Sequence, residues 1–133
     1  VRAVPLGDGH MVGIAKGAGM IEPNLATMLC FILTDVKIDR PVLRKALKTA
    51  VQNSFNCISV DGDQSTSDMV LIMSSNKKES ESITLFEKAL TELCFELAED
   101  IVRNGEGIGH VIRVSVINAP ASNLAKGIGN SCT

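Results

Sequence analysis

Two short, almost wholly apolar runs constrain the fold of this chain more than any other feature of its sequence. The first covers residues 28–36 (Met-Leu-Cys-Phe-Ile-Leu-Thr-Asp-Val), and the second covers Met69–Met73. Both runs are bounded by turn-forming residues and are too short for a buried helix, so they predict strands that are buried on both faces. Neither run reaches the roughly 18 apolar residues that a membrane-spanning helix needs.

A helical periodicity follows each of these two runs. The first helix is predicted to begin at Asp39, because Pro41 then falls in the first turn, where its missing N–H is tolerated. Its apolar positions recur at helical spacing at Val42, Leu43, Ala46, Leu47, Ala50 and Val51. The second helix covers residues 82–103, with an apolar stripe and a largely acidic opposite side, and is predicted to end in a left-handed cap at Asn104-Gly105.

The remaining segments carry weaker patterns. Residues 1–12 suit either a hairpin or a frayed start, Cys57–Val60 and Val111–Ile117 are strand-like, and Asn76–Ser80 is predicted to be a surface turn. A further helix is predicted to begin in Ala119–Gly127. The predicted order is therefore β-β-α-β-β-α-β-α, which is an α/β fold of the α+β layered-sandwich type. No internal repeat or linker divides residues 1–133, so we expect them to form a single, partial domain.

Composition narrows the partners that this chain could have. There is no Trp and no Tyr, so the core is expected to be aliphatic and base-stacking platforms are scarce. The net charge of −2 leaves no basic footprint for nucleic acid, and neither nucleic acid nor membrane is expected as a partner. The chain begins with Val rather than Met, which suggests a fragment or a processed piece.

The four cysteines and two histidines do not indicate a metal site. No Cys-x-x-Cys pair exists, and no histidine stands at a metal-ligand spacing from a cysteine. Cys30, Cys57 and Cys94 lie in apolar stretches and are predicted to be buried free thiols. His10 and His110 belong to no nucleophile-elbow or helical metal motif and are predicted to be surface or loop residues.

Three segments hold side chains that could carry chemistry. The loop from Asp61 to Asp68 begins like a calcium loop, but Ile72 stands where the bidentate acid would be, so a turn whose side chains bond nearby backbone is favoured. The stretch Gly13–Gly19 lacks the order of a phosphate-binding loop, but predicts a close backbone approach with Lys16 beside it. Thr27 precedes a buried strand, where a threonine is usually structural.

The string around Thr27 closely resembles the self-cleavage region of the ornithine acetyltransferase family of arginine biosynthesis. It runs Gly13-Ile-Ala-Lys-Gly-Ala-Gly-Met-Ile-Glu-Pro-Asn-Leu-Ala-Thr-Met-Leu29. Further strings match in order, namely Thr34-Asp35, Ser54-Phe55-Asn56, Val60-Asp-Gly-Asp63 with Ser65-Thr66 and Asp68, and Asn104-Gly-Glu-Gly107. The resemblance covers residues 12–130 and corresponds to the middle of a longer family member.

The resemblance implies a self-processing threonine nucleophile. Family members cut themselves between an Ala and a Thr, which here correspond to Ala26 and Thr27. Residues 1–26 would then end an α-chain and residues 27–133 would begin a β-chain. Cleavage frees the α-amine of Thr27, whose reference pKa of about 7.7–8 suits a local base for its own hydroxyl.

The resemblance also implies the reaction and its substrate contacts. Thr27 would take acetyl from N-acetylornithine and pass it to glutamate, with acetyl-CoA as a possible second donor and no cofactor. Lys16 and Glu106 match substrate-binding residues of the family, suited to a carboxylate and to the ammonium of ornithine. The cleaved chains would assemble as a heterotetramer, in the cytoplasm of bacteria or in mitochondria or plastids of eukaryotes.

Two other functions remain open for these 133 residues. The family's oxyanion-hole Thr-Gly pair would lie before Val1, and further substrate contacts would lie beyond Thr133, so we expect this piece to be inactive alone. One alternative is a non-catalytic, truncated α/β module that only associates with other chains. The other is a related self-processing aminopeptidase, against which the strings around Lys16 and Glu106 argue.

Overall fold

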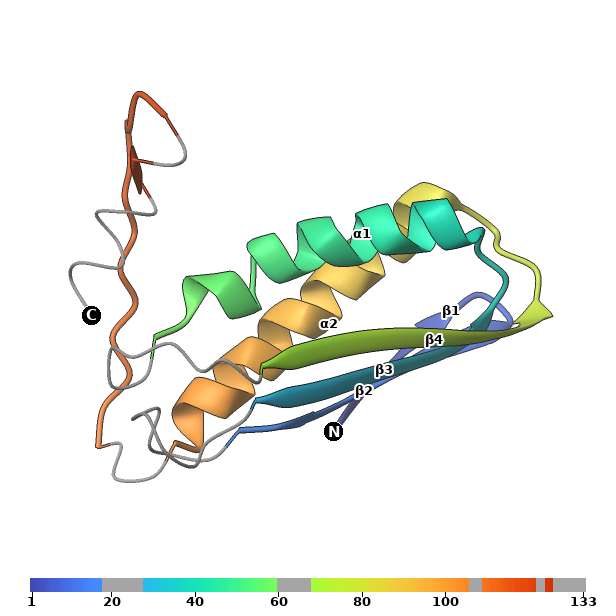
Figure 1. Cartoon of the computed structure of the whole chain (residues 1–133), viewed down its shortest axis with the longest axis horizontal. Helices are drawn as coiled ribbons and strands as arrows, with labels where there is room; N and C mark the ends of the chain where they lie inside the picture. Colours follow the sequence, from blue (N-terminus) through green and yellow to red (C-terminus); the bar gives the residue numbers. More distant parts are fainter. Residues whose placement is uncertain (18–27, 60–67, 106–108, 122–123, 126–133) are drawn as a thin grey trace.

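The computed structural model of the chain places two long helices on one face of a four-stranded sheet (Figure 1). It describes residues 1–17, 28–59, 68–105, 109–121 and 124–125. The strands, in their order across the sheet, are β1 (Arg2–Leu6), β2 (Gly9–Lys16), β3 (Leu29–Val36) and β4 (Met69–Lys78). The helices are α1 (Arg40–Gln52), the short 3-10 helix η1 (Phe55–Cys57) and α2 (Ile83–Arg103). The architecture is α+β, as predicted.

The sheet combines antiparallel and parallel pairs. β1 and β2 form a hairpin joined by Gly7-Asp8, and Gly7 has a φ of 60°, which glycine adopts without steric cost. β3 pairs antiparallel with β2 and parallel with β4. A parallel pair needs a crossover connection, and α1 lies in the chain between β3 and β4. Because β1 pairs antiparallel with β2, the hairpin is confirmed as the structure of residues 1–12, and the frayed start is not.

Both long helices begin where the sequence predicts. α1 follows Asp39 with Pro41 in its first turn. α2 follows Ser82, whose Oγ accepts a hydrogen bond from the N–H of Leu85 (3.4 Å), a typical N-cap contact. No helix in the described part of the chain is long and apolar enough to cross a membrane.

The core lies between the helices and the sheet and is aliphatic, as expected. Most of its members come from α2, α1 and the helix-facing positions of the strands, with Phe86 as the largest fully buried side chain. The buried residues are Leu6, Met11, Cys30, Ile32, Val36, Ile38, Ala46, Ala50, Phe55, Phe86, Ala89, Leu90, Leu93, Cys94, Leu97, Ala98 and Ile101.

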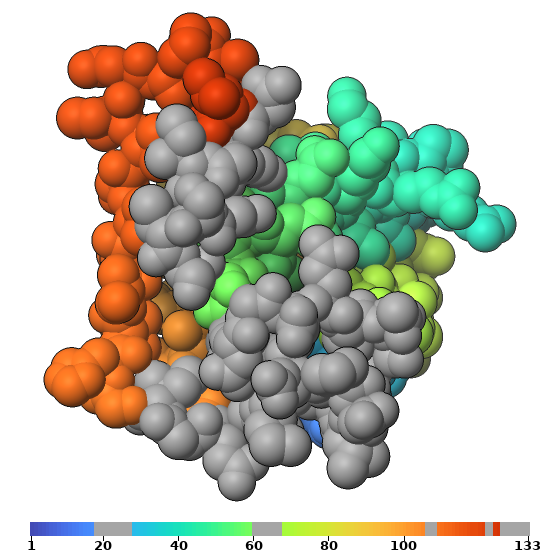
Figure 2. Space-filling view, turned by 60° about the vertical axis from the view of Figure 1, so that its left-hand side comes forward, coloured from blue at the N-terminus to red at the C-terminus, as the bar shows by residue number. Residues whose placement is uncertain are grey.

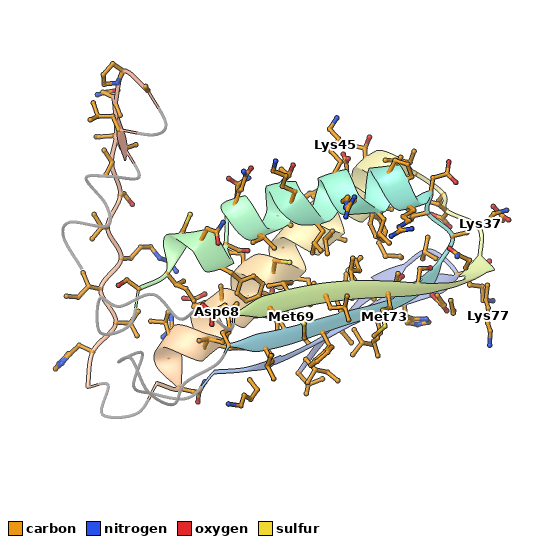
Figure 3. All side chains as sticks on the ribbon, viewed as in Figure 1. Lys37, Lys45, Asp68, Met69, Met73 and Lys77 are labelled. Carbon is orange, nitrogen blue, oxygen red and sulfur yellow. The ribbon has the colours of Figure 1, made fainter. Side chains whose placement is uncertain are left out.

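The opposite face of the sheet is largely apolar and exposed, which corrects the prediction of strands buried on both faces. Side chains alternate across a strand, and in the described residues both long helices cover the same side. The exposed apolar residues of the uncovered face are Ile14, Leu33, Met69, Leu71 and Met73. Figure 3 shows Met69 and Met73 along β4, on the edge of the ribbon away from α1.

The predicted surface turn at Asn76–Ser80 is wrong over its first three residues, because β4 continues to Lys78. The register of β3 and β4 changes between the pairs Thr34↔Ser74 and Val36↔Lys78, so β4 accommodates extra residues there. Asn76 takes a positive φ of 53° within this irregularity, which asparagine tolerates better than most residues. A polar sequence therefore forms a bulged strand end rather than a turn.

Two predicted strands also differ from the structure. Cys57 belongs to η1 rather than to a strand, although Ile58 after it is extended. Residues 111–117 form no strand, and Ile112 and Ile117 are 77% and 80% exposed. The alternation of apolar and polar residues suits a strand, but a strand also needs a neighbouring strand to pair with. In the described part of the chain no strand lies beside this segment. Of the helix expected in Ala119–Gly127, the described residues include a short helical piece at 124–125.

The cysteines divide into two classes, which leads to a labelling prediction. Cys30 and Cys94 are buried, as predicted, but Cys57 is exposed, and Cys132 lies outside the described residues. Burial raises the pKa of Cys30 to about 11, and burial together with the nearby Cys30 thiol raises the pKa of Cys94 to about 12. Because the thiolate is the reactive form, we expect iodoacetamide at neutral pH to alkylate Cys57 and to spare the two buried thiols.

Peptide mapping by mass spectrometry, before and after denaturation in urea, measures this difference. Alkylation of Cys30 or Cys94 at the rate of Cys57 in the folded protein would contradict the described burial. In urea all three thiols should react at similar rates.

Candidate active site

One end of the sheet gathers the ends of several elements (Figure 1). β2 ends at Lys16, β3 begins at Leu29 and β4 begins at Met69, and these three residues lie opposite one another across the sheet. The last residues of α2, which ends at Arg103, lie at the same end. The ends of these three strands and of α2 therefore lie near one another.

The predicted site residues flank this end of the sheet in the sequence. Lys16 is described, is exposed and pairs with Leu29 at the start of β3. Ala26 and Thr27 lie outside the described residues, but Thr27 is bonded to Met28, which immediately precedes β3. Glu106 also lies outside the described residues and follows Gly105, just after the end of α2. The fold thus brings together Lys16 and the chain neighbours of Thr27 and Glu106.

Both the N–H and the carbonyl of Met28 are hydrogen-bonded to residues at the start of β4, namely Asp68 and Met69. The N–H donates to Oδ1 of Asp68 (3.0 Å), and the carbonyl accepts from the N–H of Met69 (2.9 Å). Residues 61–67 of the predicted turn lie outside the described residues, and the carboxylate of Asp68 at its end reaches a residue 40 positions away in the sequence. Only the parallel pairing of β3 with β4 brings the two together, and local sequence patterns do not reveal that pairing.

The glycine-rich stretch makes the predicted close approach, and the neighbouring element is α2. A Cβ atom at Gly13 would lie 2.5 Å from Cδ1 of Leu97, and one at Gly17 would lie 2.8 Å from Cγ2 of Ile101. Both distances are too short for a real side chain, so glycine lets β2 pack directly against the second half of α2. This packing places the end of β2 close to the end of α2, while Lys16, two residues from Ile14 along β2, stands on the uncovered face of the sheet.

Ion pairs surround the last turns of α2. Arg2 of β1 donates two hydrogen bonds to the carboxylate of Asp100 (2.8 Å each), and this contact lowers the pKa of Asp100. Glu99 accepts from Arg103 (2.7 Å) and Arg113 (2.9 Å), and the hydrogen bond from Arg103 is the main reason why the pKa of Glu99 is lowered. The arginines of these pairs are exposed and the carboxylates half-buried, so each pair is expected to add little to the stability of the fold.

The helix ends at the predicted Asn104-Gly105. Asn104 has a φ of −106°, and the N–H of Gly105 donates to the carbonyl of Val102 (3.3 Å), a hydrogen bond typical of helix C-caps. Both the backbone N–H and the side-chain Nδ2 of Asn104 donate to the carbonyl of Asp100 (3.1 and 2.7 Å). The side chain of Asn104 thereby adds a second donor to a carbonyl that the backbone N–H of the same residue already satisfies.

An open pocket of about 660 Å³ lies between the end of α2 and the segment that follows it. It is lined by Glu99, Arg103, Gly109, His110, Val111 and Arg113. Figure 2 shows the segment after α2, coloured orange to red, running along one side of the molecule. His10 and His110 are both exposed, as predicted. Among the described residues, no group of three or more His, Cys, Asp or Glu side chains could hold a metal ion.

Comparison with known proteins identifies the family. The family model described as "ArgJ family" matches residues 2–133. The chain belongs to the ArgJ family. This result confirms the resemblance found in the motifs around Thr27 and Glu106, because relatives in the ArgJ family include a protein named glutamate N-acetyltransferase.

Three ArgJ-family proteins illustrate the similarity. The "Arginine biosynthesis bifunctional protein ArgJ 2" of Clostridium acetobutylicum is 43% identical over 131 residues, which are 98% of this chain and 34% of the relative. The "Glutamate N-acetyltransferase" of Methanopyrus kandleri is 47% identical over 135 residues, covering 94% of this chain and 35% of the relative. The crystal structure of the arginine biosynthesis bifunctional protein ArgJ of Bacillus halodurans has a TM-score of 0.55 and 40% identity, over 59% of this chain and 40% of that chain.

The 133 residues span about a third of the length of these curated relatives. The similarity to the Bacillus halodurans structure supports the α+β fold, since strands and helices of this chain match a solved ArgJ-family chain. The roles of Thr27, Lys16 and Glu106 stay predictions from the motifs.

Proposed function

We propose that the full-length protein carrying this chain transfers acetyl from N-acetylornithine to glutamate through a covalent intermediate on Thr27. The observation that carries the proposal is the match of residues 2–133 to the ArgJ family, which includes the string around Thr27. The printed names of the relatives, a glutamate N-acetyltransferase and arginine biosynthesis proteins, support this reaction. Acetyl-CoA is a possible second acetyl donor.

The first step is self-cleavage between Ala26 and Thr27. The Thr27 hydroxyl attacks the carbonyl carbon of Ala26, the peptide C–N bond breaks, and the acyl group moves from nitrogen to oxygen. Water then hydrolyses the ester, which leaves a carboxylate on Ala26 and a free α-amine on Thr27. That amine is the base that the hydroxyl needs for the next step.

Acetyl transfer then proceeds in two half-reactions. The Thr27 hydroxyl gives its proton to the α-amine and attacks the acetyl carbonyl of N-acetylornithine, and ornithine leaves with that proton. The amine of glutamate attacks the resulting acetyl ester, which regenerates the threonine hydroxyl and releases N-acetylglutamate. Each half-reaction develops negative charge on the carbonyl oxygen, so it needs positioned hydrogen-bond donors or cations.

Lys16 and Glu106 are proposed to bind the substrates. The exposed position of Lys16 at the end of β2, opposite the start of the strand that follows Thr27, supports a role in binding a carboxylate or stabilising the developing charge. Glu106 follows the capped end of α2 and would pair with the ammonium group of ornithine. The family's oxyanion-hole residues are expected outside these 133 residues, so activity requires the longer chain.

The cleaved chains are proposed to remain together and to assemble as a heterotetramer. The apolar, exposed face of the sheet supports packing against further polypeptide, because large exposed apolar patches commonly mark interfaces. The net charge of −2 agrees with small-molecule substrates rather than nucleic acid.

Intact mass spectrometry of the full-length protein tests the proposal. After purification and incubation we expect two chains whose masses sum to the precursor plus one water, with the new N-terminus at Thr27. The variant Thr27→Ala should remain one uncleaved chain, because the attacking hydroxyl is gone. Incubation of the cleaved protein with N-acetylornithine should add one acetyl group to the chain that begins with Thr27.

Two results would contradict this function. A folded full-length protein that stays at the precursor mass would exclude self-processing at Ala26–Thr27. Cleavage that persists in Thr27→Ala would exclude this hydroxyl as the nucleophile.

A further inference from the structure

The hydrogen-bond ladder between the parallel strands β3 and β4 is extended by one residue through the side chain of Asp68, which accepts the N–H of Met28. The regular pairing begins at Leu29↔Met69. One residue earlier, the carbonyl of Met28 still accepts from the backbone of Met69, but its N–H donates to the carboxylate of Asp68. In Figure 3, Asp68 lies at the start of β4, where β3 also begins. The peptide unit before β3 is therefore fixed by a side chain that a substitution can remove.

The contact acts on the bond next to the proposed nucleophile. The nitrogen of Met28 is bonded to the carbonyl carbon of Thr27, so the atom that Asp68 holds belongs to the peptide bond between Thr27 and Met28. A nucleophile loses on the order of a hundredfold in rate when it is displaced by about 1 Å. A restraint on this peptide bond limits the positions open to Thr27.

We propose that Asp68 is a positioning residue, which places Thr27 for attack by accepting the hydrogen bond of the Met28 N–H. This inference rests on the proposed function of Thr27. Asp68 acts as a hydrogen-bond acceptor for the Met28 N–H, and through Met28 on Thr27. It sets the start of β3 both in the precursor and in the cleaved protein.

The same sheet offers a matched contact away from Thr27. Oδ1 of Asp35 accepts the N–H of His10 (2.7 Å), so an aspartate again holds a strand N–H of a neighbouring strand. Asp35 lies near the far end of β3, about 20 Å from Leu29 at the usual rise per strand residue. Replacing Asp35 removes the same kind of hydrogen bond as replacing Asp68, but at a position far from Thr27.

The test compares Asp68→Ala, Asp68→Asn and Asp35→Ala in the full-length protein, with the rate of self-cleavage followed by intact mass. We expect Asp68→Ala to slow cleavage about tenfold to a hundredfold. Asp68→Asn keeps an oxygen that can accept the Met28 N–H, so its rate should return to near that of the unaltered protein. Asp35→Ala should cleave at the unaltered rate, and circular dichroism should show all three variants folded.

A second readout separates positioning from substrate binding. In the cleaved protein, Asp68→Ala should lower kcat for acetyl transfer while KM for N-acetylornithine changes little. Hydrogen exchange of the Met28 amide should become faster in Asp68→Ala and stay protected in Asp68→Asn.

The outcomes distinguish this inference from the function on which it rests. Failure of the unaltered protein to cleave would overturn both. If the unaltered protein cleaves and Asp68→Ala cleaves equally fast, the positioning role is overturned while the function of Thr27 stands. The positioning role is also overturned if Asp68→Asn is as slow as Asp68→Ala, or if Asp35→Ala is slowed to the same extent.

Discussion

Replacing Lys16 with methionine in the full-length protein is expected to lower kcat/KM for acetyl transfer by about a hundredfold to a thousandfold. Removal of one group that stabilises charge in the transition state has an effect of this size. Methionine keeps most of the aliphatic length of lysine, so the exposed end of β2 should remain folded. Steady-state assays with N-acetylornithine and glutamate, over a range of both concentrations, measure the effect.

Lys77→Met is the matched control for this substitution. Lys77 is also an exposed strand lysine, but it lies near the end of β4 that is opposite Asp68 (Figure 3). Its replacement should leave kcat/KM unchanged. Equal losses in the two variants would mean that the effect comes from net charge rather than from a site at the end of β2.

Phe86→Ala is expected to destabilise the fold by about 3–5 kcal/mol, the usual result of removing a fully buried aromatic side chain. Phe86 is 1% exposed and is the largest fully buried side chain of the core. The core has few aromatic residues, and the aliphatic side chains around Phe86 can fill the cavity only in part. Urea unfolding of the full-length protein, followed by circular dichroism, measures the free energy of unfolding.

Phe95→Ala makes the same chemical change on the same helix at an exposed position. Phe95 is 49% exposed, and the guanidinium of Arg113 lies 5.9 Å from the centre of its ring. Its removal should lower stability by about 1 kcal/mol or less. Similar losses in both variants would contradict the burial of Phe86 between α2 and the sheet.

Elements with a strong local period could be predicted from the sequence. α1, α2 and β3 have their apolar positions on one helical stripe or in one compact run, and the structure confirms them nearly to the residue. The pattern at residues 111–117 is equally regular but gives no strand, because strand formation requires hydrogen-bond partners that a local pattern does not contain. The exposed face of β4 was mispredicted because apolar character alone does not say which layers cover a strand.

In the candidate site too, features that depend on neighbouring residues could be predicted, and contacts between distant residues could not. Local patterns alone identify Lys16 only as a lysine beside a glycine-rich stretch, and a site shared with Thr27 and Glu106 is predicted from the resemblance of their motifs. The contact between Asp68 and Met28 joins residues 40 positions apart and follows from the parallel register of β3 and β4. Sequence analysis could identify the string that contains Asp68, but not the strand end to which its carboxylate binds.

The parallel pairing of β3 with β4 has a consequence for the order of events during synthesis. The hairpin of β1 and β2, and β3 beside it, can pair as soon as residues up to Val36 have emerged from the ribosome. β4 ends at Lys78, so the outer neighbour of β3 is completed only after α1 has also been synthesised. Contacts between distant segments form slowly, because closing the loop between them costs entropy first. During synthesis there is therefore a period in which the start of β3, next to Thr27, is paired with β2 but not yet with β4.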